Sequence, residues 1–271
     1  MLIDFHTHTF PEKIAARTIE VLQSNTMRVE KKYTPNYTDA TVSGLLASMD
    51  THGVDISVIL PIATAPKQTT TINTVASHTN EHERLFSFGS LHPMQEDWEA
   101  VLYGIAEKGL KGIKLHPEYQ QFYIDSPESV RVLKLCEKLG LLVTLHAGRD
   151  VGIEPPVHCM PEMLRRVMDY EVKGDNIIAA HMGGWRVWDE VEKWLVGTPV
   201  NFDTAYVSLD MDKEQFVRIV NTHGADKILF ATDSPWESPE MTLKFINESG
   251  LDEMQKSLIF AENAKKLLKI V

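Results

Sequence analysis

The chain has 271 residues, of which 43% are hydrophobic and 24% charged, the ordinary balance of a folded globular protein. Its net charge of −11 argues against nucleic acids and membranes as partners, because nucleic acids and anionic membrane surfaces attract basic patches. The two cysteines make no disulfide framework, and no signal peptide or bilayer-length apolar run is recognisable, so we expect a cytoplasmic protein with a single domain over residues 1–271.

Eight short apolar runs recur along the chain, each followed by a polar stretch and a segment with helical periodicity. Most of these runs are apolar throughout rather than alternating, which is typical of parallel strands that are covered on both faces. The predicted strands are residues 2–5, 55–62, 85–91, 112–115, 141–145, 176–180, 199–203 and 227–232.

Helices are predicted between these strands. One begins after Ser126 as N-cap, with Pro127 in its first turn, and stops before Gly140; the same device recurs over residues 238–250. Further helices are expected at residues 96–108, 160–170, 186–196, 211–223 and 252–269.

The connection between the first two strands, residues 11–54, is the longest in the chain. Its pattern indicates two helices around an irregular stretch, "NTMRVEKKYTPNYTD" at residues 25–39. Because so long a connection would lie beside the strand ends, we expect it to cap the active site.

Eight strands alternating with helices over about 250 residues predict an α/β fold of the closed (β/α)8 type, a TIM barrel. The alternative is a doubly wound open sheet, but no predicted strand is followed by G-x-G-x-x-G or by a P-loop. In a barrel the active site lies at the carboxyl ends of the strands, so the residues that follow each apolar run are the candidates for chemistry.

Histidines gather at these strand ends. Side chains two residues apart on a strand point to the same side, so the first pair projects together. Six of the eleven histidines, and one late aspartate, follow predicted strands: His6, His8, His92, His116, His146, His181 and Asp233. A mixture of neutral imidazoles and a carboxylate suits a zinc-like divalent ion with one position left for water. The five other histidines fall in predicted helices or loops, where we expect local hydrogen bonds or solvent: His52, His78, His82, His158 and His223.

Five motifs, "IDFHTHTFPE", "GIKLHP", "LHAGRD", "AHMGGWRVW" and "FATDSPW", together resemble the amidohydrolase superfamily, and within it the amidohydrolase-2 group, the relatives of aminocarboxymuconate-semialdehyde decarboxylase. The resemblance runs from the first strand to the last. It implies one divalent metal ion, with zinc expected and manganese or iron as alternatives. The implied ligands are His6, His8, His146 and Asp233, and the implied proton-handling residues are His181 and Asp233.

Lys114 leaves the number of ions open. Two-metal members of the superfamily carry a carboxylated lysine on the fourth strand, and Lys114 lies on that strand. If it bridged two ions, His146 and His181 would serve the second one. The closer relatives generally lack that bridge, so we favour one ion. His116, two residues after Lys114, is expected to line the site or to make a structural hydrogen bond near its floor.

Several weaker signals concern the substrate. Arg149 could clamp a substrate carboxylate or pair with Asp150 or Glu154. Trp185, like Trp236, follows a presumed site residue and would wall the pocket or pack a loop onto the barrel. Arg28, in the long first connection, is a further candidate for a substrate contact.

These observations predict a metal-dependent hydrolase that acts with an activated water on a C–N, ester or lactone bond of a small-molecule substrate. The alternative is a lyase, a non-oxidative decarboxylase or hydratase of an unsaturated or aromatic carboxylate. A third reading, a non-catalytic barrel that keeps its metal, is disfavoured by the intact pair His181 and Asp233. The sequence leaves the formation of a homodimer open.

Overall fold

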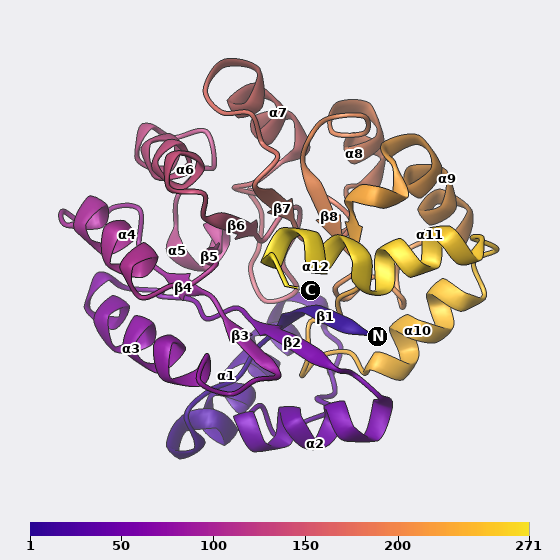
Figure 1. Cartoon of the computed structure of the whole chain (residues 1–271), viewed down its shortest axis with the longest axis horizontal. Coiled ribbons are helices and arrows are strands. Elements are labelled where there is room, and N and C mark those ends of the chain that lie inside the picture. The colour runs from indigo at the N-terminus through magenta and orange to yellow at the C-terminus, as the bar shows by residue number, and fades with distance from the viewer. Residues whose placement is uncertain (271) are drawn as a thin grey trace.

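The computed structural model describes residues 1–270 of the chain. Nine strands correspond to the eight predicted runs, because the third run is divided in two, and the first strand continues two residues beyond its predicted end. They are β1 (Ile3–Thr7), β2 (Ile56–Ile59), β3 (Leu85–Ser87), β4 (Gly89–Ser90), β5 (Gly112–Leu115), β6 (Leu142–Leu145), β7 (Ile177–Ala179), β8 (Asn201–Asp203) and β9 (Ile228–Leu229). Figure 1 shows them in the middle of a ring of helices.

All strand pairs are parallel and follow the order of the chain, β1-β2-β3 and β4 through β9. The backbone N–H of Phe88 donates to the carbonyl of Ile59 at 2.9 Å, which joins the two sets across the break in the third run. The N–H of Phe5 donates to the carbonyl of Phe230 at 2.9 Å, which ties the last run back to the first. The predicted (β/α)8 barrel is confirmed.

The helices largely follow the prediction. In α6 (Pro127–Leu139) the Ser126 side chain accepts a hydrogen bond from the N–H of Ser129, and Gly140 ends the helix at φ +68°, where a side chain would be strained. α10 (Pro239–Asn247) is capped in the same way by Ser238. The others that the sequence predicted are α2 (Val42–His52), α4 (Trp98–Glu107), α7 (Pro161–Tyr170), α8 (Trp188–Trp194) and α9 (Lys213–His223).

Two of the predicted helices differ from the prediction. The first helix, α1 (Glu12–Glu30), continues six residues into the stretch expected to be irregular. The expected C-terminal helix is divided into α11 (Glu253–Ser257), a π-helical turn (Leu258–Glu262) and α12 (Asn263–Leu268). The carbonyl of Ile259, within the π-helical turn, accepts the N–H of Phe230 at 2.9 Å. This carbonyl is therefore hydrogen-bonded to the barrel at the point where the helix changes to the wider π form.

Three further helices had not been assigned from the pattern: η1 (Pro66–Gln68), α3 (Thr69–Thr79) and α5 (Pro117–Gln120), while η2 (Ala225–Lys227) is a single turn before β9. The sequence of α3, "TTTINTVASHT", is rich in β-branched residues, which have low helix propensity. Its burial of Thr69, Asn73 and Ala76 against the barrel outweighs that preference.

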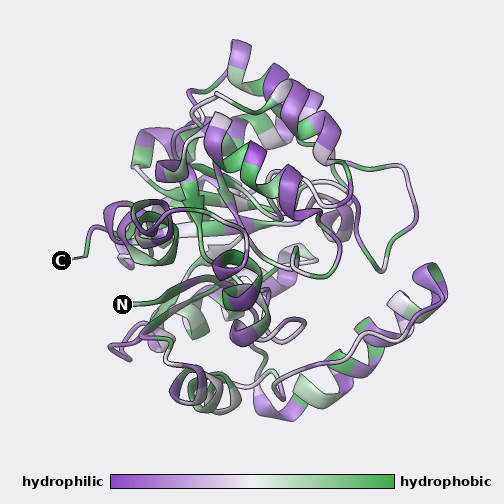
Figure 2. Cartoon of the chain, turned by 90° about the vertical axis from the view of Figure 1, so that its right-hand side faces the viewer, coloured by the Kyte–Doolittle hydropathy of each residue, from purple (hydrophilic) through white to green (hydrophobic). Residues whose placement is uncertain are grey.

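The two ends of the barrel differ. At one end, residues from several strands, among them Ile3, Val58 and Leu229, pack with Ala264 and Leu268 of α12 in one buried apolar cluster. In Figure 1 α12 and the C-terminus lie across the middle of the ring, and in Figure 2 both termini lie on the left. The strands end on the other side of the barrel, where α1 stands out at the lower right of Figure 2. Within residues 1–270, no helix combines the length and the apolar character needed to cross a bilayer.

Candidate metal centre

A cavity of about 210 Å³ opens at the carboxyl ends of the strands. One wall comes from α1, whose Thr18, Leu22 and Thr26 lie one turn apart on the same face of the helix. The predicted site residues that line the cavity are His6, His8, Lys114, His116, His146, Arg149, His181, Trp185, Trp236 and Asp233. Two candidates, His92 and Arg28, do not line it. The Nδ1 atom of His92 accepts the N–H of Met94 at 3.3 Å, and Arg28 donates to the carbonyl of Gly152 at 3.4 Å.

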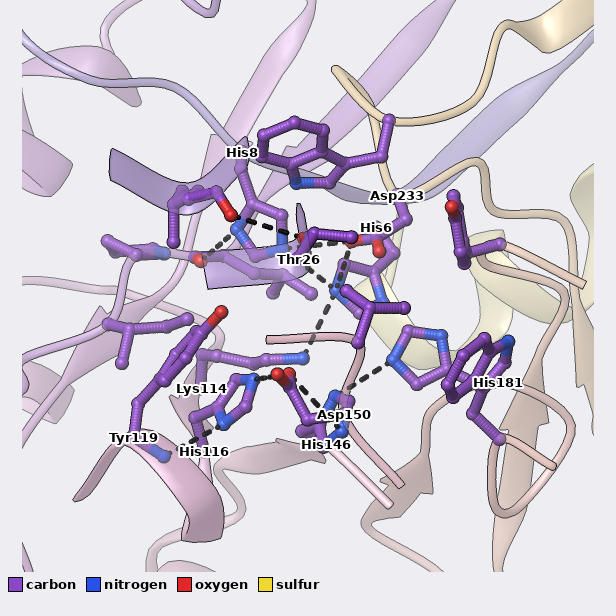
Figure 3. A pocket seen from close by; sticks show the side chains of 18 of the residues that line it. His6, His8, Thr26, Lys114, His116, Tyr119, His146, Asp150, His181 and Asp233 are labelled. Carbon is purple, nitrogen blue, oxygen red and sulfur yellow. Dashed lines mark hydrogen bonds and ion pairs between the residues drawn. The ribbon is translucent and has the colours of Figure 1, made fainter. Parts of the chain in front are cut away.

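Three of the four predicted metal ligands form one cluster (Figure 3). The Nε2 atoms of His6 and His8 are 3.2 Å apart. The Oδ1 atom of Asp233 lies 3.4 Å from the first and 3.0 Å from the second. The N–H of Asp233 donates to the carbonyl of His6 at 2.9 Å, so the barrel closure itself brings the last strand end to the first.

Outer hydrogen bonds orient both imidazoles. The Nδ1 atom of His6 lies 2.9 Å from the carboxylate of Asp203, and the Nδ1 atom of His8 lies 2.9 Å from the carbonyl of Leu60. Since both partners only accept, each Nδ1 carries the ring proton and each Nε2 keeps a lone pair. Two lone pairs and a carboxylate oxygen thus face one another, an arrangement that suits a bound cation.

The donor set fits a divalent ion of the zinc class. Ligands at about 2.0–2.1 Å in tetrahedral geometry would stand about 3.3 Å apart, close to the 3.0–3.4 Å separations of this cluster. Burial, followed by the charge of Lys114, lowers the pKa of His6, which keeps that ring neutral.

The fourth predicted ligand, His146, lies beside this cluster rather than within it. It groups with His116 and Asp150, where the Asp150 Oδ2 atom is 3.5 Å from the Nε2 of His116 and 3.8 Å from the Nε2 of His146. The two rings are stacked, with centroids 4.1 Å apart and planes only 11° from parallel. An ion bound to a histidine lies near the plane of its ring, and two stacked planes share no such position. We therefore interpret this second group as stacked rings beside a carboxylate, not as a second chelate.

His146 still presents one nitrogen to the cavity. Its Nε2 lies 3.0 Å from the carbonyl of Arg149 and therefore carries the ring proton, while its Nδ1 lies 3.0 Å from the Nε2 of His181. The Nδ1 of His181 lies 2.8 Å from the carbonyl of Ala205 and carries that ring's proton. Two lone pairs therefore face each other between His146 and His181, and a proton or a metal ion is required there.

Lys114 lies at the floor of the cavity, 1% exposed. Its Nζ atom is 3.1 Å from the Nε2 of His6, and within residues 1–270 no carboxylate oxygen comes within ion-pair distance of it. Burial lowers the pKa of Lys114 to about 8, against the opposing pull of Asp203, Asp233 and Asp150. A barrel carboxylate as its direct partner, one of the sequence-based expectations, is therefore not what the structure contains.

Arg149 and Trp185 both line the cavity; the arginine is exposed to solvent, which places it at the mouth, and the tryptophan is buried. In the described part of the chain Arg149 pairs with neither Asp150 nor Glu154, the two partners weighed from the sequence. Arg186 lies over the ring of Trp185, 4.0 Å from its centroid, and its guanidinium also reaches Glu30 of α1 at 2.7 Å.

Sequence reasoning missed Asp203, which is fully buried and contacts the ring of His6. It also missed Tyr119, whose ring stacks on His116 with centroids 4.0 Å apart and lines the cavity. A signal existed for Asp203, because it is the polar residue that closes the seventh apolar run, in the position where the other runs place their histidines. No pattern marked Tyr119, which reaches the cavity through the short helix α5.

Comparison with solved structures finds the same fold in enzymes of known chemistry. A 5-carboxyvanillate decarboxylase from Sphingomonas paucimobilis has a TM-score of 0.68 and 18% identity, over 100% of this chain and 99% of that one. The corresponding decarboxylase from Novosphingobium aromaticivorans, solved with manganese and 3-methoxy-4-hydroxy-5-nitrobenzoic acid, has a TM-score of 0.73 and 15% identity over 100% and 97%. A probable 2-pyrone-4,6-dicarboxylic acid hydrolase from Acinetobacter baumannii, with citric acid bound, has a TM-score of 0.65 and 16% identity over 99% of both chains.

At such low identities these likenesses establish the fold and leave the reaction open. No curated protein matches the chain significantly. The model of the amidohydrolase family, in contrast, matches residues 3–270, nearly the whole sequence, and with it all the strand-end motifs described above. The protein is therefore an enzyme of the amidohydrolase family, built on a (β/α)8 barrel.

Proposed function

We propose that the protein is a metal-dependent lyase, a non-oxidative decarboxylase of an aromatic or unsaturated carboxylate. The observation that carries this proposal is that one cavity is lined by a metal-type cluster, by the cation of Arg149 and by aromatic side chains. The decarboxylases among the structural neighbours support it. The sequence had favoured hydrolysis, with this reaction as the alternative.

The proposed cofactor is one divalent ion held by His6, His8, His146 and Asp233, with zinc or manganese as the metal. When bound, the ion acts as a Lewis acid toward an oxygen of the substrate. Trp185 and Tyr119 pack against the flat apolar part of the substrate, and Arg149 binds an anionic group near the mouth.

The proposed proton donor is the His181–Asp233 pair. In the reaction the bond between the ring carbon and its carboxylate breaks, carbon dioxide leaves, and the carbon atom takes up one proton. Because the carbonyl of Ala205 holds the Nδ1–H of His181, the transferred proton would be one taken up on Nε2, the ring atom in the cavity wall that lies 3.0 Å from the Nδ1 of His146. The buried site keeps bulk water from competing with that transfer.

Hydrolysis remains a second candidate, because the same metal-type cluster would serve to activate a water molecule for attack on a lactone or amide. The probable pyrone dicarboxylate hydrolase among the structural neighbours favours it. Both candidates use a small-molecule substrate, and both need the same ion.

The two reactions are separated by their products. Protein loaded with zinc or manganese is incubated with hydroxylated benzoates and carboxyvanillate, with release of carbon dioxide measured, and in parallel with lactones and activated esters, with release of acid measured. Carbon dioxide from a benzoate, lost in His181→Asn and in protein stripped of metal, supports the lyase. Acid release without carbon dioxide would contradict the lyase and support hydrolysis. His6→Ala, which loses a proposed metal ligand, is the inactive control for both reactions.

A further inference from the structure

The carboxylate of Asp203 contacts the site without facing the cavity. It ends β8, is fully buried and does not line the pocket. Its Oδ2 atom lies 2.9 Å from the Nδ1 of His6, and its Oδ1 atom accepts the N–H of His181 at 2.8 Å and of Ala205 at 3.1 Å. All these contacts go to residues that orient the metal-type cluster and the proposed proton donor.

The contact with His6 favours the ring proton on Nδ1, and the Nζ of Lys114, which lies 3.1 Å from Nε2, favours the same tautomer. A carboxylate can only accept, so it holds the hydrogen on Nδ1 and leaves the lone pair on Nε2, the atom that faces His8 and Asp233. Without the carboxylate the other tautomer becomes accessible, and its Nε2–H cannot bind a metal ion.

The contact with His181 holds a strained backbone. His181 has φ +60°, in the left-handed region that a residue with a side chain rarely adopts. Its N–H donates to the side chain of Asp203, and the next N–H, of Met182, donates to the Asp203 carbonyl at 2.7 Å. The same carboxylate binds the N–H of Ala205, whose carbonyl accepts the ring proton of His181. One side chain therefore supports the orientation of two histidines.

We propose that Asp203 is a positioning residue, which sets the tautomer of His6 and thereby the affinity of the site for its metal ion, and which also holds the orientation of His181. The inference rests on the proposed metal centre. Its first half, the tautomer of His6, concerns the protein without metal and can be tested separately.

The chain offers a matched control. Asp4 is also a buried carboxylate next to His6, but it accepts the backbone N–H of His6 at 3.2 Å and both the N–H and the hydroxyl of Thr232. It contacts no imidazole nitrogen in the described residues. Asp4→Asn therefore replaces a similarly buried carboxyl group while leaving both rings with their partners.

The experiment compares wild type, Asp203→Asn and Asp4→Asn. In Asp203→Asn, the amide oxygen can still accept the backbone N–H groups of His181 and Ala205. The amide NH₂ then faces the Nδ1 of His6, and because it can only donate, it favours the ring proton on Nε2. Ring-nitrogen NMR of the metal-free, histidine-labelled proteins reports the tautomer, and competition with a chelator reports the affinity for zinc. We expect the Nδ1–H form in wild type and Asp4→Asn, the Nε2–H form in Asp203→Asn, and a roughly 10–100-fold loss of zinc affinity in Asp203→Asn alone.

An Nε2–H tautomer of His6 in wild-type protein would overturn the inference. This measurement uses wild-type protein alone, so it does not depend on whether the variants fold. An unchanged tautomer in Asp203→Asn, or a zinc affinity within threefold of wild type, would overturn it as well. If wild type binds no zinc or manganese, the proposed function fails, while the NMR comparison still decides the role of Asp203.

Discussion

His223 is buried far from the cavity and couples the stability of the barrel to pH. Its ring is 2% exposed and stacks on Phe202 with centroids 4.1 Å apart. Nε2 donates to the carbonyl of Val200 at 2.8 Å, and Nδ1 accepts the N–H of Gly197 at 3.1 Å, so the native ring is neutral. Burial lowers the pKa of His223 to about 4, with the bond to Val200 opposing the shift and Lys227 adding to it.

The sign of the effect follows from proton uptake by the unfolded chain. In the unfolded chain the pKa of a histidine is about 6.5, so between pH 6.5 and 4 the unfolded state binds a proton at His223 and the folded state does not. Stability is therefore full above about pH 6.5 and falls as the pH is lowered toward 4. A shift of about 2.5 pKa units corresponds to about 3 kcal/mol at the acid end, of which about 2 kcal/mol is already lost at pH 5.

The assay is urea unfolding at pH 8, 7, 6 and 5, with chelator present so that loss of the ion does not contribute. His223→Gln has no titrating group at this position, so its free energy of unfolding should fall by about 2 kcal/mol less than that of wild type between pH 8 and 5. His78→Gln is the control, because the ring of His78 is 72% exposed and its loss should leave the pH profile parallel to that of wild type. Parallel profiles for His223→Gln and wild type would refute the reasoning.

Three further predictions concern the site. His181→Asn should keep the metal content of wild type and lose activity by about 10²–10⁴-fold, as measured by elemental analysis and turnover; loss of the ion would instead make His181 a ligand. Lys114→Ala should still bind one ion per chain, whereas a fall from two ions to fewer, dependent on bicarbonate, would indicate a carboxylated lysine bridge. Arg186→Met should raise the KM about tenfold, because Arg186 ties α1 to the cavity wall through Glu30 and Trp185. Arg218→Met, which breaks a pair with Glu192 remote from the cavity, should leave KM unchanged.

Much of the fold was readable because it depends on local patterns. Continuous apolar runs mark strands buried on both faces, and Ser126 with Gly140 marks the two ends of a helix through capping groups only a few residues away. Where the prediction failed, distant contacts decided. The π turn in the last helix occurs where the carbonyl of Ile259 is taken by Phe230 of the barrel, and α3 forms in spite of its threonines because the barrel buries one face of it.

The site divides in the same way. Strand periodicity and the order of the motifs identified His6, His8 and Asp233, because parallel strands bring their carboxyl ends to one edge and each of these residues comes within three positions of the end of a predicted apolar run. Which nitrogen of each ring faces the cavity, that His146 stacks on His116, and that Asp203 holds the ring of His6 were decided by the tertiary structure alone. Those features depend on hydrogen bonds between residues up to 197 positions apart, and such pairings leave no periodicity in the sequence.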